Sequence, residues 1–235
     1  MTAPYWLPPD SNSPFPDVSL ALTEPDGLLA IGGDLTVERL MAAYRNGIFP
    51  WYSDEQPVLW WSPDPRSVLM VDELHVSKSL NKTIRKNLFS VTMDHAFEEV
   101  IVHCAQPRKD SLGTWITDEM QQAYIRLHHA GYAHSVECWF QDKLVGGLYG
   151  VALGQVFFGE SMFSTKTDAS KVAFVSMVRQ LQKWGFVLVD CQIKSEHLDR
   201  FGAISIPRKR FIEQLNTYCV KNTSVTSWQS KLPGC

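Results

Sequence analysis

Apolar residues recur along this chain with two different periods, and the period predicts which segments are helices and which are strands. After a Thr117 cap, for example, Met120, Ala123, Tyr124 and Leu127 follow the spacing of three and four that is typical of a helix. Alternating or continuous apolar stretches between turn residues indicate strands instead. The patterns predict helices over residues 36–47, 95–105, 117–131, 169–184, 196–201 and 207–219. They predict strands over residues 67–71, 135–140, 144–153, 156–163 and 186–193.

The order of these elements predicts a mixed α/β fold. From residue 117 onward it runs helix, three antiparallel strands, helix, strand and helix. The first part of the chain differs, because proline and glycine interrupt it frequently. We therefore expect a small N-terminal domain over residues 1–90 and a second domain over residues 91–235, with a boundary near residues 85–95.

Large aromatic residues gather within residues 32–66, GGDLTVERLMAAYRNGIFPWYSDEQPVLWWSPDPR. Prolines at 50, 57, 63 and 65 stiffen the backbone between the rings of Phe49, Trp51, Tyr52, Trp60 and Trp61. Two interpretations remain open. The rings can form a small aromatic core, or they can form rigid platforms on which flat ligands such as nucleobases stack.

The composition of the 235-residue chain is that of a soluble globular protein, with 45% hydrophobic and 20% charged residues. We find neither an apolar stretch long enough for a membrane span nor a secretory signal, and we expect a cytoplasmic protein. The five cysteines are odd in number and form no C-x-x-C pair. This pattern favours reduced thiols over disulfides, and we predict no metal site.

Basic residues cluster twice in a chain whose net charge is −3. Each cluster is either an ordinary solvated helix face or part of one track for a nucleic-acid backbone. The members are Lys78, Lys82, Arg85 and Lys86 in the first cluster, and Arg208, Lys209 and Arg210 in the second.

One carboxylate falls near the end of the strand predicted over residues 156–163, in the segment GESMFS. Burying the charge of Glu160 is costly unless it is paired or faces a cavity. Glu160 therefore either forms a structural ion pair with an arginine or receives a cationic group of a ligand.

An acid and an amide occur together in the segment VDCQ. Strand alternation would put Asp190 and Gln192 on one face and Cys191 on the other. Such a pair at a strand end can orient a nucleophile and take up its proton. The alternative is that Asp190 caps the following turn. Cys191 has no neighbouring histidine in sequence, so we assign it to the core.

Several motifs in family order resemble the leucyl/phenylalanyl-tRNA–protein transferases. The most specific are GIFPW (47–51), WWSPDPR (60–66), GESMFS (159–164) and DCQ (190–192). The resemblance extends over roughly residues 15–210.

This resemblance implies a fold, a reaction and a set of partners. The implied second domain is GNAT-like, with the fold of the GCN5-related acetyltransferases. The implied reaction moves Leu, Phe or Met from aminoacyl-tRNA to the N-terminal Arg or Lys of acceptor proteins, which marks them for degradation by the N-end rule pathway. No cofactor and no metal are required, because the donor ester is already activated. We expect a monomer without membrane partners.

The resemblance also implies roles for particular residues. Asp190 and Gln192 match an acid–amide pair beside the attacking amine, and Glu160 matches a second acid there. Trp51, Trp115 and Tyr124 match positions around the terminal adenosine of the tRNA. The matched pocket for the donor side chain comprises Leu148, Phe157, Met162, Phe174, Met177 and Val189.

Two other functions remain to be weighed. A CoA-dependent acetyltransferase of the same fold is disfavoured, because the pyrophosphate-binding pattern Q/R-x-x-G-x-G/A is absent from the sequence. A non-catalytic tRNA- or peptide-binding module is the other alternative. The presence of Glu160, Asp190 and Gln192 beside the aromatic segment argues against it.

Overall fold

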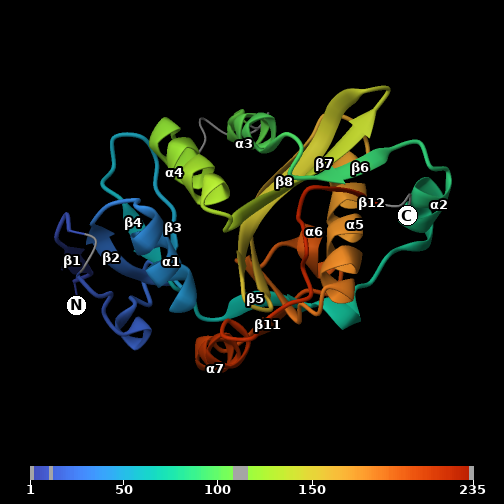
Figure 1. The fold of residues 1–235 in the computed structure, drawn as a ribbon. Coiled ribbons are helices and arrows are strands. Elements are labelled where there is room, and N and C mark those ends of the chain that lie inside the picture. Colours follow the sequence, from blue (N-terminus) through green and yellow to red (C-terminus); the bar gives the residue numbers. More distant parts are fainter. Residues whose placement is uncertain (1–2, 11–12, 108–115, 233–235) are drawn as a thin grey trace.

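The computed structural model describes residues 3–10, 13–107 and 116–232, which form two β-sheets with helices packed around them (Figure 1). The smaller sheet has the strand order β1-β2-β4-β3, and the larger one has the order β11-β5-β10-β9-β8-β7-β6-β12. The predicted mixed α/β class and the small N-terminal unit are thus confirmed. Among the described residues, no helix combines the length and the apolar character needed to span a bilayer.

The smaller sheet comprises β1 (Tyr5–Leu7), β2 (Leu28–Gly32), β3 (Phe49–Pro50) and β4 (Leu59–Trp61). Helix α1 (Val37–Arg45) begins after Thr36, whose side chain accepts a hydrogen bond from the backbone N–H of Arg39. The 3-10 helix η1 (Val18–Leu20) precedes β2.

Most of the aromatic residues of this region form a core, which is one of the two interpretations of the sequence. Trp60 is fully buried, and its Nε1 donates to the carbonyl of Gly32 at 2.8 Å. Phe49 and Tyr52 are also buried. Trp51, by contrast, remains 41% exposed. Most of the rings form a core that supports one exposed ring.

The larger sheet is antiparallel except where β9 and β10 pair in parallel. A parallel pair needs a crossover connection, and the buried helix α5 (Ala169–Lys183) provides it. The strands are β5 (Arg66–Met70), β6 (Ser90–Met93), β7 (Ala133–Phe140), β8 (Lys143–Leu153), β9 (Val156–Ser164), β10 (Leu188–Gln192), β11 (Ile204–Ile206) and β12 (Ser230–Leu232).

Helices cover both faces of this sheet (Figure 1). Helix α5 packs on one face, and α3 (Phe97–Ala105) and α4 (Asp118–His129) pack on the other. Alternation along β8 accordingly sends Leu148 to the core beneath α5 and Tyr149 to the core beneath α3 and α4. The remaining helices are η2 (Val71–Glu73), α2 (Lys78–Arg85), α6 (Glu196–Asp199) and α7 (Arg208–Tyr218).

The chain passes from the smaller sheet to the larger one over residues 62–65, between β4 and β5. The segment from β5 to β6 therefore belongs to the larger sheet, although the sequence pattern assigned residues up to 90 to the N-terminal unit. The pattern could not detect this, because β5 pairs with strands more than a hundred residues further along the chain. The division into domains at residue 90 stays a prediction.

Two glycines that face each other across β8 and β9 give a test of this packing. Gly150 pairs with Gly159, but a Cβ at Gly150 would lie 2.2 Å from the carbonyl oxygen of Phe158. A Cβ at Gly159 would meet only the carbonyl oxygen of Asp190, at 3.5 Å. We expect Gly150→Ala to lower the free energy of unfolding by about 1–3 kcal/mol through overpacking. The matched Gly159→Ala should be nearly neutral in thermal or denaturant unfolding, and equal effects of the two changes would contradict this packing.

Candidate active site

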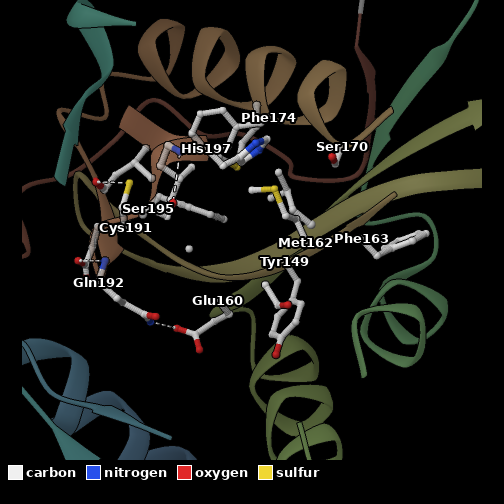
Figure 2. Close-up of a pocket in the computed structure, with 18 of the residues that line it drawn as sticks. Tyr149, Glu160, Met162, Phe163, Ser170, Phe174, Cys191, Gln192, Ser195 and His197 are labelled. Carbon is white, nitrogen blue, oxygen red and sulfur yellow. Dashed lines mark hydrogen bonds between the residues drawn. The ribbon is translucent and has the colours of Figure 1, made fainter. Parts of the chain in front are cut away.

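An apolar cavity of about 420 Å³ lies between α5 and the strands β8, β9 and β10. Figure 2 shows it with Phe174 at the end away from Glu160 and Gln192. All six residues predicted for the donor pocket line this cavity: Leu148, Phe157, Met162, Phe174, Met177 and Val189. The structure thus brings together residues from four elements in one space, which has Glu160 and Gln192 at one end and polar Ser170, Ser195 and His197 toward the other.

Three neutral donors surround the Glu160 carboxylate. The hydroxyl of Tyr44 donates to Oε1 at 2.7 Å, and the hydroxyl of Tyr124 donates to Oε2 at 2.8 Å. The side-chain amide of Gln192 donates to Oε1 at 2.9 Å. In the described part of the chain no basic side chain forms an ion pair with Glu160, so the interpretation of this residue as the acid of a structural ion pair is wrong.

The environment of Glu160 raises the pKa of its carboxyl group to about 7. Burial is the main cause, because it disfavours the charged form, and the negative charge of Asp190 acts in the same direction. The hydrogen bonds from Tyr44 and Tyr124 and the charge of Arg66 lower the pKa but do not offset burial. Burial also raises the pKa of both tyrosines well above the usual value, so they act as neutral donors. Glu160 can therefore exchange a proton near neutral pH.

Asp190 is the acid that forms the buried ion pair. Nε of Arg66 donates to Oδ1 at 2.8 Å, and Nη2 donates to Oδ2 at 2.6 Å. Both side chains are almost completely inaccessible to solvent. Oδ1 also accepts the backbone N–H of Gln192 at 2.9 Å, so Asp190 does cap the following turn as the structural alternative supposed. Both oxygens of Asp190 are thus occupied within the protein.

The predicted alternation of side chains ends at this turn. The pairing of β10 with β5 shifts register between Asp190 and Gln192, and Gln192 has a positive φ of 59°. Asp190 consequently binds Arg66, whereas Gln192 reaches Glu160. The Sγ of Cys191 lies 3.8 Å from the carbonyl of Val189, and burial raises the pKa of this thiol far above its usual value. A thiolate nucleophile is therefore disfavoured, but the assignment to the core is wrong, because Cys191 is only partly buried and lines both cavities of the site.

A second, smaller cavity of about 150 Å³ shares Glu160 and Gln192 with the first. Its other walls include Phe49, Trp51 and Ile193. The Trp51 ring lies 5.8 Å from that of Trp61, whose Nε1 donates to the carbonyl of Trp51 at 2.7 Å. This support holds a partly exposed ring near the end of the larger cavity where Glu160 and Gln192 lie.

The other two residues expected around an adenosine have different outcomes. Tyr124 is fully buried, and it contributes its hydroxyl to Glu160 rather than a ring face to solvent. Its ring meets Tyr149 edge-on, at 5.4 Å between centroids. Trp115 lies outside the described residues.

The two basic clusters lie at opposite edges of the larger sheet (Figure 1). Helix α2, which carries the first cluster, precedes the edge formed by β6 and β12, and α7, which carries the second, follows β11. The four basic residues of the first cluster are exposed. In the second, Arg208 is half-buried and donates through Nη1 to the carbonyl of Ser62. This arrangement does not favour a single continuous track.

Sequence reasoning missed two residues of the site, Arg66 and Tyr44. Tyr44 belongs to the apolar stripe of α1, and a periodic stripe does not reveal that the hydroxyl at its end finds a carboxylate. Arg66 ends the motif WWSPDPR and begins a strand, where a buried cation requires a buried anion. The sequence did imply an acid–arginine pair, but only the structure shows that the acid is Asp190.

The raised pKa of Glu160 can be measured directly. We expect ¹³C-carboxyl NMR of the glutamates, with Glu160→Gln for assignment, to show a titration midpoint of about 7 for Glu160. Tyr44→Phe should move this midpoint upward, because it removes a donor that favours the charged form. Tyr52→Phe is a matched control, since Tyr52 donates to a different carboxylate, Glu119, at 3.1 Å. A midpoint near the ordinary value of 4.5 would contradict this description.

Comparisons with known proteins agree with these features. Residues 33–64 match the model of the leucyl/phenylalanyl-tRNA protein transferase N-terminal domain, and residues 68–216 match that of leucyl/phenylalanyl-tRNA protein transferase. The leucyl/phenylalanyl-tRNA–protein transferase of Stutzerimonas stutzeri (strain A1501) is 59% identical over 225 residues, covering 96% of this chain and 99% of that protein. The enzyme of the same name from Pseudomonas syringae pv. syringae (strain B728a) is 54% identical, with coverage of 96% and 98%.

The solved structure of L-PGS from Bacillus licheniformis aligns with 87% of this chain and with 66% of the L-PGS chain. The sequence identity is 9% and the TM-score is 0.39. A score this low supports no assignment of the fold. The two family models and the nearly full-length relatives do assign the family: this chain belongs to the leucyl/phenylalanyl-tRNA–protein transferase family.

Proposed function

We propose that this protein transfers Leu, Phe or Met from aminoacyl-tRNA to the N-terminal Arg or Lys of acceptor proteins. The product is a new peptide bond, and the modified protein is marked for degradation by the N-end rule pathway. The observation that carries the proposal is the apolar cavity that ends at Glu160 and Gln192, in a chain of this family. The cavity fits an amino-acid side chain, and the polar end fits the reacting groups.

The reaction requires that the two reactants be held in position and that one proton be removed from the attacking amine. The α-amine of the acceptor attacks the ester carbonyl of the donor, the C–N bond forms, and the 3′-terminal ribose oxygen of the tRNA leaves. The amine has a pKa of about 7.7–8.0, so a fraction of it is already neutral at neutral pH. Aminolysis of an activated ester is favourable, so holding the two reactants together supplies most of the catalysis.

Glu160 is the group best suited to take the proton from the amine. General bases work best when their pKa lies near the working pH, and the pKa of Glu160 is about 7. Gln192 donates its amide to Glu160, so its own carbonyl oxygen is the atom that can accept a hydrogen bond from the amine. Asp190 has both oxygens bound by Arg66, which favours a positioning role over proton transfer.

The donor side chain would occupy the 420 Å³ cavity. Met162 and Met177 in its wall are unbranched, and they can adapt to donors of different shape. The tRNA terminus would then lie toward the smaller cavity, where the exposed Trp51 ring can stack on adenine. Trp115 remains a further candidate for contact with the terminal adenosine. Tyr124, whose ring is buried, would act on this region indirectly, through its hydrogen bond to Glu160. The exposed basic residues of α2 and α7 are candidates for separate contacts with the tRNA backbone.

The finer assignments of architecture and location belong to the same proposal. The antiparallel run β7–β9, the crossover α5 and the parallel strand β10 support a GNAT-like second domain. The use of aminoacyl-tRNA favours a cytoplasmic location, and the activated donor ester requires no cofactor. The proposal also takes in a protein that acts as a monomer. A non-catalytic tRNA- or peptide-binding module remains the alternative outcome.

Transfer of labelled leucine tests the activity. We expect leucyl-tRNA to label peptides that begin with Arg or Lys, but not one that begins with Ala. Glu160→Gln should slow transfer by about 10²- to 10⁴-fold if Glu160 is the proton acceptor. Thermal protection by aminoacyl-tRNA but not by acetyl-CoA would exclude the acetyltransferase alternative. Folded protein that binds tRNA without transferring leucine would instead identify a binding module.

The shape of the donor cavity makes a second prediction. Cβ-branched Val and Ile should enter the methionine-lined cavity less well than Leu, Phe and Met. We expect their kcat/KM to be lower by about tenfold or more, the range over which apolar pockets discriminate. All donors should be attached to one tRNA body and compared on the same Arg peptide, so that only the side chain changes. Equal use of Val and Leu would show that the donor side chain does not occupy this cavity.

A further inference from the structure

We propose that Arg66 is a positioning residue for the transfer reaction, which fixes Gln192 and Glu160 relative to the segment that carries Trp51. Arg66 is not placed in contact with either substrate. It acts through the groups that it holds, and this inference rests on the proposed function.

The guanidinium of Arg66 is bound on every side. Besides its two bonds to Asp190, it donates through Nη1 to the carbonyl of Gly47 at 3.1 Å. Its central carbon lies 4.8 Å from the ring centroid of Phe49 and 4.7 Å from that of Phe211. These partners come from the α1–β3 connection, β3, β10 and α7. One planar group therefore joins four parts of the chain.

Arg66 also lies between the two segments that match the family models, which end at residue 64 and begin at residue 68. Gly47 and Phe49 belong to the first segment, and Phe49 lies two residues before Trp51. Asp190 and Phe211 belong to the second segment. The side chain of a connecting residue thus sets the position of one segment relative to the other at the site.

A short chain of hydrogen bonds leads from Arg66 to the candidate base. Asp190, oriented by Arg66, accepts the backbone N–H of Gln192 at 2.9 Å, and Gln192 donates its amide to Glu160 at 2.9 Å. The positive φ of Gln192 is unfavourable for a non-glycine residue, so this turn needs external support. If Asp190 moved, the amide of Gln192 and its bond to Glu160 would move with it.

Lysine cannot reproduce this arrangement. Its ammonium group carries the same charge, but it lacks the planar fork that binds a carboxylate through two parallel bonds and stacks between rings. Arg66→Lys therefore keeps the buried charge and removes the geometry. Comparing Arg66→Lys with the unmodified protein therefore separates the effect of geometry from the effect of charge.

The charges around Glu160 provide an independent readout. Tyr44 on α1, Tyr124 on α4 and Tyr149 on β8 approach it as neutral hydroxyls. Asp190 on β10 raises the pKa of Glu160, and Arg66 on β5 lowers it. Removal of the Asp190 charge alone, in Asp190→Asn, should therefore lower the apparent pKa of the reaction. Arg66→Lys retains the positive charge, so it should not lower that pKa, and loss of the Gln192 donor would raise it.

Single-turnover transfer from saturating leucyl-tRNA to an Arg peptide tests the proposal. We expect Arg66→Lys to lower the plateau rate by about 10²-fold, the loss typical of a displaced reacting group, without the downward shift of the pH profile expected of Asp190→Asn. Arg39→Lys is the matched control, because Arg39 is equally buried, donates to the carbonyls of Asp10 and Ser13, and lies over the ring of Phe15. Its rate should change little once the folded fraction is equal.

Three results would overturn the proposal: a normal plateau in Arg66→Lys, a loss no greater than that of Arg39→Lys at equal folded fraction, or a loss accompanied by a downward shift of the pH profile. If Arg66→Lys does not fold, Asp190→Asn decides, since it preserves the shape of the side chain. A lowered plateau and a lowered apparent pKa in that variant would support the chain from Arg66 to Glu160, and an unchanged profile would refute it. Absence of transfer by the unmodified protein would instead refute the proposed function itself.

Discussion

The ion pair between Arg66 and Asp190 is the interaction on which the arrangement of the site depends. Removing two charges from water costs several kcal/mol per ion, and mutual attraction offsets this only when the geometry is close to ideal. Here the pair is bidentate, and two aromatic rings and a backbone carbonyl complete the surroundings of the guanidinium. A pair of this kind contributes little net stability compared with apolar residues of similar volume. Its partners lie on β10, on α7, on β3 and in the connection before β3, so the guanidinium links these parts of the chain to β5.

The same pair creates the difference between the two acids of the site. Asp190 forms an ion pair with a guanidinium, whereas Glu160 accepts hydrogen bonds from two phenol hydroxyls and one amide. Neutral donors stabilise a buried carboxylate less than a cation does, so burial dominates and raises the pKa of Glu160 to about 7. A cation beside Glu160 would make it an ordinary structural acid. Its capacity to exchange protons follows from the position of the arginine at the other carboxylate.

Local patterns predicted the elements that local physics determines. The strands β7, β8 and β9 and the helices α1, α4 and α5 have clear periodicity and capping residues, and the structure contains them close to their expected bounds. The helix α2 and the strands β1–β4, β6, β11 and β12 were not predicted. These strands are short and depend on pairing with other segments of the chain. The six pocket residues came from motif resemblance, and they do line one cavity. The role of the Arg66 side chain could not be predicted, since nothing near residue 66 indicates a carboxylate at residue 190.

The two cavities explain why Glu160 and Gln192 lie where they do. The 420 Å³ and 150 Å³ cavities share Glu160, Cys191 and Gln192, so two substrates that occupied these spaces would meet beside the proposed proton acceptor. The larger space is enclosed by the core beneath α5, which belongs to the larger sheet, whereas Phe49 and Trp51 of the smaller space belong to the N-terminal segment. Neither segment contains a complete site by itself. Because the reacting groups must be held to within a fraction of an ångström, the contact between the segments has to be rigid, and a buried planar cation bound on every side meets that requirement better than an apolar contact that can slide.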